Sequence, residues 1–134
     1  MKILVTDDSM VMRKIIVNVV ESLGHVAIHA ANGHQMLDVL AESGTEIGLV
    51  LLDWNMPGLT GIEALKIMKG THAYDHVPVF MVSTESEDGK INEAIAAGAT
   101  GYLAKPFTAD ELAAKIEQAH MKGSAMSGPR GEHV

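Results

Sequence analysis

The sequence predicts an α/β fold in which a doubly wound parallel sheet of five strands is covered by five helices. Short apolar runs alternate five times with helix-length amphipathic stretches, and this alternation is typical of α/β proteins. The run 47–52 is apolar on both faces, as expected of a central parallel strand with helices on each side. The chain has 134 residues, of which 47% are hydrophobic and 20% charged, which is enough for one domain with its own core.

The first half of the chain supplies three strand and helix pairs. Strands are predicted over Lys2–Thr6, 25–30 and 47–52, and the helices that follow them over 10–23, 33–42 and 61–69. The first helix ends at Gly24, and its apolar spacing predicts an inward face of Val11, Ile15, Val19 and Leu23. The second begins after a capping Asn32 and turns inward Met36, Leu37 and Leu40. Thr60 and Glu63 form a capping box that opens the third.

The second half continues the same alternation. A strand over 77–82 is followed by a helix over 88–97 that Gly98 ends, and a short strand over 100–103 by a helix over 109–121. Thr108 and Glu111 form a second capping box at the start of this last helix. The domain is therefore expected to span 1–121. Residues 122–134 are rich in Gly, Ser and Pro and are expected to form a flexible C-terminal tail.

Composition excludes several classes of partner. Ten Lys and Arg residues against 17 Asp and Glu residues give a formal charge of −7, which argues against binding nucleic-acid phosphate. Apolar runs are far shorter than the roughly 20 residues of a membrane span, and the acidic pair at 7–8 comes too early for a signal peptide. We expect a cytoplasmic, monomeric protein without a membrane or nucleic-acid partner. The absence of cysteine excludes disulfides and thiolate metal sites.

Polar side chains follow four of the predicted strands at the point where each strand ends. Ligands of parallel sheets bind beyond the carboxyl ends of the strands. The side chains expected to converge there are Asp7, Asp8, Asp53, Ser83, Thr84 and Lys105. The sequence therefore places three carboxylates, two hydroxyls and one ammonium at one edge of the sheet.

Three clustered carboxylates call for a cation. Two unit charges about 4 Å apart repel by about 4 kcal/mol at an effective dielectric of 20, so the cluster would not stay ionised unaided. An all-oxygen donor set favours Mg²⁺. An aspartate beside a hard cation and a lysine is a plausible phosphoryl acceptor, which explains why a buried strand ends on Asp53 before the sharp turn of "WNMPG".

Four blocks of sequence resemble the receiver domain of two-component response regulators. They are "VTDDSMVMRK" (5–14), "LLDWNMPGLTGIEAL" (51–65), "PVFMVSTES" (78–86) and "GYLAKPFTADEL" (101–112). The resemblance covers about residues 1–121 and is greatest to stand-alone chemotaxis regulators. It implies the flavodoxin-like strand order 2-1-3-4-5.

The resemblance also implies a role for each site residue. Asp53 would accept a phosphoryl group from the phosphohistidine of a CheA-like sensor kinase. Mg²⁺ would be bound by Asp8, Asp53, the backbone carbonyl of Asn55 and, through water, Asp7. The phosphoryl group would be sensed by Lys105, Ser83 and Tyr102. No enzymatic activity is implied beyond Mg²⁺-dependent self-phosphorylation and self-dephosphorylation.

Two positions depart from the family's common pattern. Ser83 stands where threonine is frequent and lacks the methyl group that restricts threonine rotamers. Thr84 stands where alanine or glycine is usual, so it could limit the access of water to the phosphoryl group. The lifetime of the acyl phosphate would also depend on Asn55 and Glu85.

Each site residue also has a structural interpretation. Asp7 and Asp8 could be ordinary residues at a helix N-terminus, and Ser83 and Thr84 could cap the following helix. Asp53 and Lys105 could be solvated turn residues, and Tyr102 a rim aromatic. Trp54 is expected to lie exposed beside the site because it falls in a turn. The seven histidines are expected to lie on the surface.

Other functional classes fit less well. A phosphatase of the haloacid dehalogenase type would need an acid two residues after the nucleophile, where this chain has Asn55. A flavin carrier would need a phosphate-binding loop after the first strand, where Asp7 and Asp8 would repel phosphate. Among receivers, a chemotaxis switch that docks on a flagellar motor component is the first expectation. The alternatives are a phosphorelay intermediate serving a histidine phosphotransfer protein and an excised receiver of a longer regulator.

Overall fold

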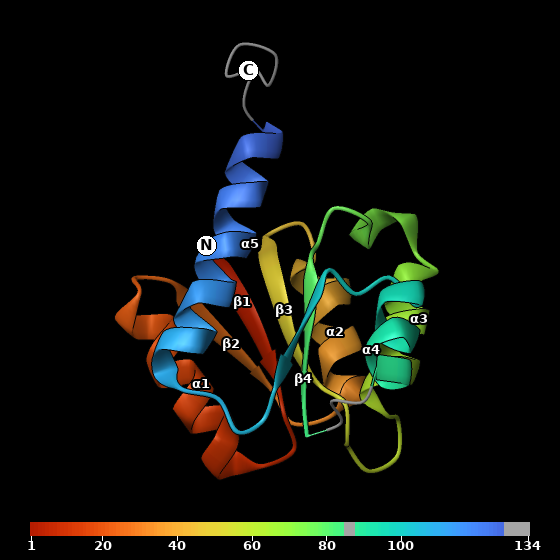
Figure 1. Cartoon of the computed structure of the whole chain (residues 1–134). Coiled ribbons are helices and arrows are strands. Elements are labelled where there is room, and N and C mark those ends of the chain that lie inside the picture. The colour runs from red at the N-terminus through yellow and green to blue at the C-terminus, as the bar shows by residue number, and fades with distance from the viewer. Residues whose placement is uncertain (85–87, 128–134) are drawn as a thin grey trace.

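The computed structural model describes residues 1–84 and 88–127, and it confirms the predicted architecture. One sheet of five parallel strands runs through the molecule in the order β2-β1-β3-β4-β5 (Figure 1). The strands are β1 (Lys2–Thr6), β2 (Val26–Ala30), β3 (Ile47–Asp53), β4 (Val79–Ser83) and β5 (Gly101–Ala104). The helices are α1 (Met10–Ser22), α2 (Gly33–Ser43), α3 (Gly61–Lys69), α4 (Asp88–Ala96) and α5 (Ala109–Ser127).

The register of the strands brings their carboxyl ends to one level. Thr6 of β1 pairs with Ala30 of β2 and with Leu52 of β3. Asp53 pairs with Val82, and Ser83 pairs with Ala104. β2 lies on one side of β1 and β3 lies on the other. The direction in which successive strands are added to the sheet therefore reverses beside β1. This is the switch point at which open α/β sheets bind ligands.

Two apolar layers cover the two faces of the sheet. Helices α1 and α5 pack on one face through buried side chains that include Ile16, Val20, Leu112 and Ile116. Helices α2, α3 and α4 cover the other face (Figure 1), with Met36, Leu40, Leu65, Met68 and Ala94 among the buried side chains. Strand β3 is buried along almost its whole length, as predicted for a central strand.

The predicted helix caps are present. The Asn32 side chain accepts from the Gln35 amide at 2.8 Å, and Thr60 and Glu63 form a reciprocal capping box. At α5 the Glu111 carboxylate accepts from the Thr108 amide at 2.8 Å and the Thr108 hydroxyl accepts from the Glu111 amide at 3.0 Å. These bonds satisfy amide groups that have no partner within their helices.

The inward face predicted for α1 is wrong in part. Val11 is 70% exposed and Ile15 is 46% exposed, whereas the residues that the helix buries are Ile16, Val17 and Val20. Of the predicted face, Val19 and Leu23 do pack against the core. The helix carries two overlapping apolar stripes of helical spacing, so periodicity alone does not say which stripe faces the sheet.

Two helical segments also differ from expectation. Helix α5 continues to Ser127 instead of ending near Met121. Residues 128–134 of the expected C-terminal tail lie outside the described residues. Gly123 does not stop the helix because an isolated helical glycine costs only about 1 kcal/mol. A short 3-10 helix over His72–Tyr74 was not predicted. Among the described residues, no helix combines the length and apolarity that a membrane crossing requires.

Candidate functional site

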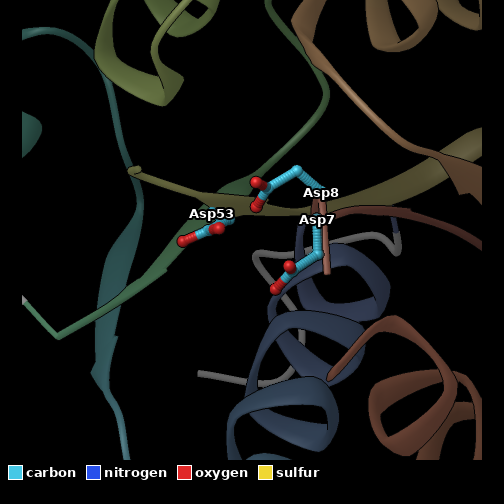
Figure 2. Close-up of side chains that lie close together, drawn as sticks. All are labelled: Asp7, Asp8 and Asp53. Carbon is cyan, nitrogen blue, oxygen red and sulfur yellow. The ribbon is translucent and has the colours of Figure 1, made fainter. Parts of the chain in front are cut away.

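Three aspartates meet at the carboxyl edge of the sheet, as the sequence predicts. Asp7 and Asp8 follow β1 and Asp53 ends β3, and each offers a carboxylate oxygen within 4.8 Å of the other two (Figure 2). Asp7 is 1% exposed and Asp53 is 5% exposed, whereas Asp8 lies open to solvent. The cluster therefore has two buried carboxylates, Asp7 and Asp53, and an accessible rim at Asp8.

Lys105 joins this cluster from the segment after β5. Its Nζ lies 3.1 Å from Oδ2 of Asp7 and 3.4 Å from Oδ1 of Asp53. The Lys105 amide also donates to the Ser83 carbonyl at 2.8 Å, which fixes the backbone on which the side chain is mounted. The lysine that the sequence assigned to the site is thus in direct contact with two of its carboxylates.

Local hydrogen bonds hold Asp7 in place. Its Oδ1 accepts from the Ser9 amide at 2.9 Å, and its own amide donates to the Ala30 carbonyl of β2 at 3.1 Å. Arg13, one turn into α1, donates from Nη1 to the Asp7 carbonyl at 2.6 Å. These bonds leave Oδ2 as the oxygen that faces Lys105.

The turn after β3 holds Asp53 by close backbone packing. Trp54 donates its amide to the Val82 carbonyl at 3.3 Å and accepts from the Gly61 amide at 2.8 Å. A Cβ atom at Gly61 would lie 2.1 Å from the Asp53 carbonyl oxygen. Only glycine at the start of α3 therefore allows the helix to approach the end of β3 this closely.

Burial and the neighbouring carboxylate set the charge state of Asp53. Burial, and next the negative charge of Asp7, raise the pKa of Asp53 to about 6, while Lys105 and the Asn55 amide act in the opposite direction. The raised pKa means that the ionised carboxylate is less stable in the folded protein than in the unfolded chain. A cation bound beside Asp53 would remove this penalty.

Because of this penalty, we predict that Asp53→Asn increases the stability of the metal-free protein, and that the increase depends on pH. A pKa raised from its ordinary value to about 6 destabilises the fold as pH rises through about 6. The variant lacks that charge, so we expect its free energy of unfolding at pH 7.5 to exceed the wild-type value by about 2 kcal/mol. The difference should shrink towards pH 4. Urea unfolding in EDTA at several pH values measures it, and a difference independent of pH would contradict the electrostatic cause.

Besides Lys105, the residues expected to sense a phosphoryl group are Ser83 on β4 and Tyr102 on β5, and the residues expected to tune its lifetime are Asn55, Thr84 and Glu85. Ser83 is fully buried at the end of β4, and its Oγ accepts from Nδ2 of Asn55 at 3.5 Å. Tyr102 of β5 is partly buried against the core between the sheet and the α2, α3 and α4 layer. Thr84 is exposed, and Glu85 lies outside the described residues.

Trp54 is buried, contrary to expectation. It is 5% exposed and belongs to the core beneath α3 and α4, although it lies in the segment after β3. Nζ of Lys90 on α4 lies 5.3 Å from the centre of its ring, within the range of a cation–π contact. No local pattern in the sequence signals this pairing, because the two residues are brought together only by the packing of α4.

The donor set of the cluster fits Mg²⁺. Three carboxylates and one ammonium sum to a formal charge of −2, which a single divalent ion balances. All available ligand atoms are oxygens, and the rim at Asp8 is open enough for the metal to keep several waters. Asp53 also ends a rigid strand with a carboxylate beside the open rim, which suits it to act as a nucleophile.

Comparisons with known proteins agree with this geometry. The family described as "Response regulator receiver domain" matches residues 3–117. The chemotaxis protein CheY of Pseudomonas aeruginosa is 41% identical over 119 residues, covering 88% of this chain and 94% of the relative. A CheY homolog of Campylobacter jejuni is 37% identical over 92% of this chain and 95% of its own length. The solved structure of Vibrio cholerae CheY4 is 30% identical, with a TM-score of 0.83 over 88% of this chain and 97% of that chain.

Proposed function

Because the chain belongs to the response regulator receiver domain family, we propose that it is a phosphorylation-activated switch of a two-component system. In this proposal Asp53 accepts a phosphoryl group from a phosphohistidine of a sensor kinase. The observation that carries it is the contact of one ammonium, Lys105, with two of three clustered carboxylates at the carboxyl edge of the sheet. Receivers are signalling switches and not classical enzymes.

The chemistry follows from the chain's own groups. An Asp53 oxygen attacks phosphorus, the bond from phosphorus to the histidine nitrogen breaks, and the imidazole leaves with a proton as an acyl phosphate forms. Lys105 would hold a phosphoryl oxygen through its ammonium. Mg²⁺ would be held by Asp8, Asp53 and the Asn55 carbonyl, with Asp7 acting through water, and would neutralise phosphoryl charge when bound.

The proposed switch links this site to the far half of the sheet. A phosphoryl dianion on Asp53 attracts the Ser83 hydroxyl and the Lys105 ammonium, which lie at the ends of β4 and β5. Movement of Ser83 would vacate space that Tyr102 can enter. The proposed output surface is therefore formed by α4, β5 and α5, and the phosphoryl group shifts the population of its two states by about 1–3 kcal/mol.

Beryllofluoride, a phosphoryl mimic, tests the switch. We expect beryllofluoride with Mg²⁺ to shift amide resonances around Asp53 and over residues 83–112, because the proposed rearrangement passes through Ser83 to Tyr102. Two-dimensional NMR of the full chain measures the shifts. Asp53→Asn is the control and should respond to neither reagent in this way. Changes restricted to the loops carrying Asp8 and Asp53 would reject the output surface and favour a phosphorelay intermediate, which needs only the site.

The partners proposed are a CheA-like sensor histidine kinase and a downstream protein. Several relatives are named as chemotaxis proteins, so a chemotaxis-type target such as a flagellar motor switch is the first choice. A histidine phosphotransfer protein is the partner in the phosphorelay alternative. We place the activity of the protein, as a monomer, in the cytoplasm, where the kinase domains of such systems act.

Trp54 should report Mg²⁺ binding. Its backbone adjoins Asp53 and it is the protein's one tryptophan, so we expect its fluorescence to change on titration with Mg²⁺. The affinity for Mg²⁺ should be modest, because two carboxylates and one carbonyl bind the ion directly and leave about half of its six coordination positions to water. Asp8→Ala should abolish the response, whereas Asp38→Ala, at an exposed position on α2, should retain it. An undiminished response in Asp8→Ala would place the ion elsewhere.

A further inference from the structure

Three side chains of the kinds that can bind metals lie together away from the aspartate cluster. His25 immediately precedes β2, at the amino end of the sheet, and it faces Glu117 and His120 of α5. Asp7, Asp8 and Asp53 lie at the opposite, carboxyl end of the strands. The expectation that all seven histidines lie on the surface is wrong for His25, whose side chain is buried.

His25 is a buried ring with one unused nitrogen. Its side chain is 8% exposed. Nδ1 lies 2.9 Å from the amino group of Met1, and because an ammonium can only donate, Nδ1 accepts. In the neutral ring the proton therefore sits on Nε2, which is buried, makes no hydrogen bond within 3.5 Å among the described residues, and faces the Glu117 carboxylate, whose interaction acts to raise the pKa of His25. A buried polar atom without a partner is rare in folded proteins and calls for an explanation, either a bound water or a ligand.

Two side chains of α5, Glu117 and His120, lie near that nitrogen and carry metal-ligating groups. Oε1 of Glu117 lies 3.8 Å from Nε2 of His25, which is beyond hydrogen-bond distance. The ring centre of His120 lies 5.4 Å from that of His25, with the ring planes at 58°. Glu117 and His120 are three residues apart, so they share one face of the helix. Both are exposed and can change rotamer without disturbing the core.

The present separations are longer than those of a tetrahedral metal site, because among the described residues the only group of three with ligand atoms already within 4.8 Å of one another is Asp7, Asp8 and Asp53. Ligand atoms about 2 Å from one tetrahedral ion are about 3.3 Å apart, and two imidazoles bound to it have ring centres about 5 Å apart. Rotation of the exposed Glu117 and His120 side chains would have to bring their ligand atoms to these separations. Burial, and next the charge of the Met1 ammonium, lower the pKa of His25, so the ring is neutral near pH 7, which is the form that binds metals.

We propose that His25, Glu117 and His120 form a Zn²⁺ site that ties α5 to the start of β2. Two imidazoles and one carboxylate are a known zinc ligand set, with water in the fourth position, and imidazole disfavours Mg²⁺. On binding, Zn²⁺ replaces the proton on Nε2 of His25, which is released to solvent. The inference is independent of the function proposed for Asp53.

Co²⁺ and Zn²⁺ titrations of the full chain test the site, with excess Mg²⁺ present to occupy the aspartate cluster. We expect one equivalent of Co²⁺ to give the intense visible absorption of a tetrahedral complex, and Zn²⁺ to displace it. His120→Ala and Glu117→Gln should each weaken binding by about tenfold or more. Both replace exposed side chains, so the variants should fold, which thermal unfolding verifies.

Two control variants separate this site from other binding. His72→Ala removes a histidine that is 98% exposed and pairs with Asp75, and it should bind Zn²⁺ as the wild type does. Asp8→Ala should also leave Zn²⁺ binding unchanged. Equal affinity in His120→Ala and the wild type, or Co²⁺ absorption of the weak octahedral kind, would overturn the proposal.

Discussion

Asp53→Asn is expected to abolish phosphorylation. Incubated with acetyl phosphate and Mg²⁺, the wild type should gain the mass of one phosphate and the variant none. The amide keeps the size and position of the side chain, but its oxygen is a poor nucleophile and it carries no charge to bind the cation. Because the reaction depends on this one bond-forming atom, the expected effect is complete loss. Intact-protein mass spectrometry measures it.

Two controls test whether the loss of phosphorylation is specific to Asp53 and dependent on Mg²⁺. Asp38→Asn, an equally conservative change at an exposed position of α2, should phosphorylate like the wild type. EDTA should suppress the gain of mass in every variant. A phosphate retained by Asp53→Asn would show that another carboxylate, such as Asp7 or Asp8, is the acceptor.

Among glycine-to-alanine substitutions outside the strands, Gly61→Ala is expected to cause the largest loss of stability. The new Cβ would lie 2.1 Å from the Asp53 carbonyl oxygen and 2.8 Å from Cα of Trp54. Both contacts are with backbone, which cannot rotate away, so α3 or the end of β3 must move. We expect the free energy of unfolding to fall by about 3 kcal/mol, as measured by urea unfolding.

Gly89→Ala is the matched control for this change. Gly89 is also a helical glycine, in α4, but nothing lies within 4 Å of the Cβ that alanine would add. There alanine should stabilise the protein by about 0.5–1 kcal/mol, because it reduces the freedom of the unfolded chain. If Gly61→Ala and Gly89→Ala had the same effect, the close approach of α3 to β3 would not be the reason for glycine at position 61.

The parts of the fold that could be predicted are those that local rules determine. Capping boxes and glycines mark the helix ends, and strand ends place the carboxylates, because parallel strands share one carboxyl edge. Asp7, Asp8, Asp53 and Lys105 could therefore be brought together without a structure. Their contact distances confirm that convergence.

The parts that could not be predicted depend on packing between distant elements. Trp54 follows a strand like any turn residue, and only the position of α4 decides that it is buried. His25 follows the glycine that ends α1, and its burial depends on α5, about ninety residues later. The buried face of α1 was ambiguous because two apolar stripes satisfy the same period, and only contact with the sheet selects one.

In the proposed reaction, the position of Lys105 before any phosphoryl group arrives would affect the rate of phosphoryl transfer. Its side chain is 14% exposed and already lies against Asp7 and Asp53, so most of its hydration has been removed during folding. In that proposed reaction an incoming phosphoryl oxygen would meet an ammonium that is already oriented and has already lost most of its hydration. Reorienting water around the ammonium would then add little to the activation barrier, because folding has already removed that water and oriented the side chain.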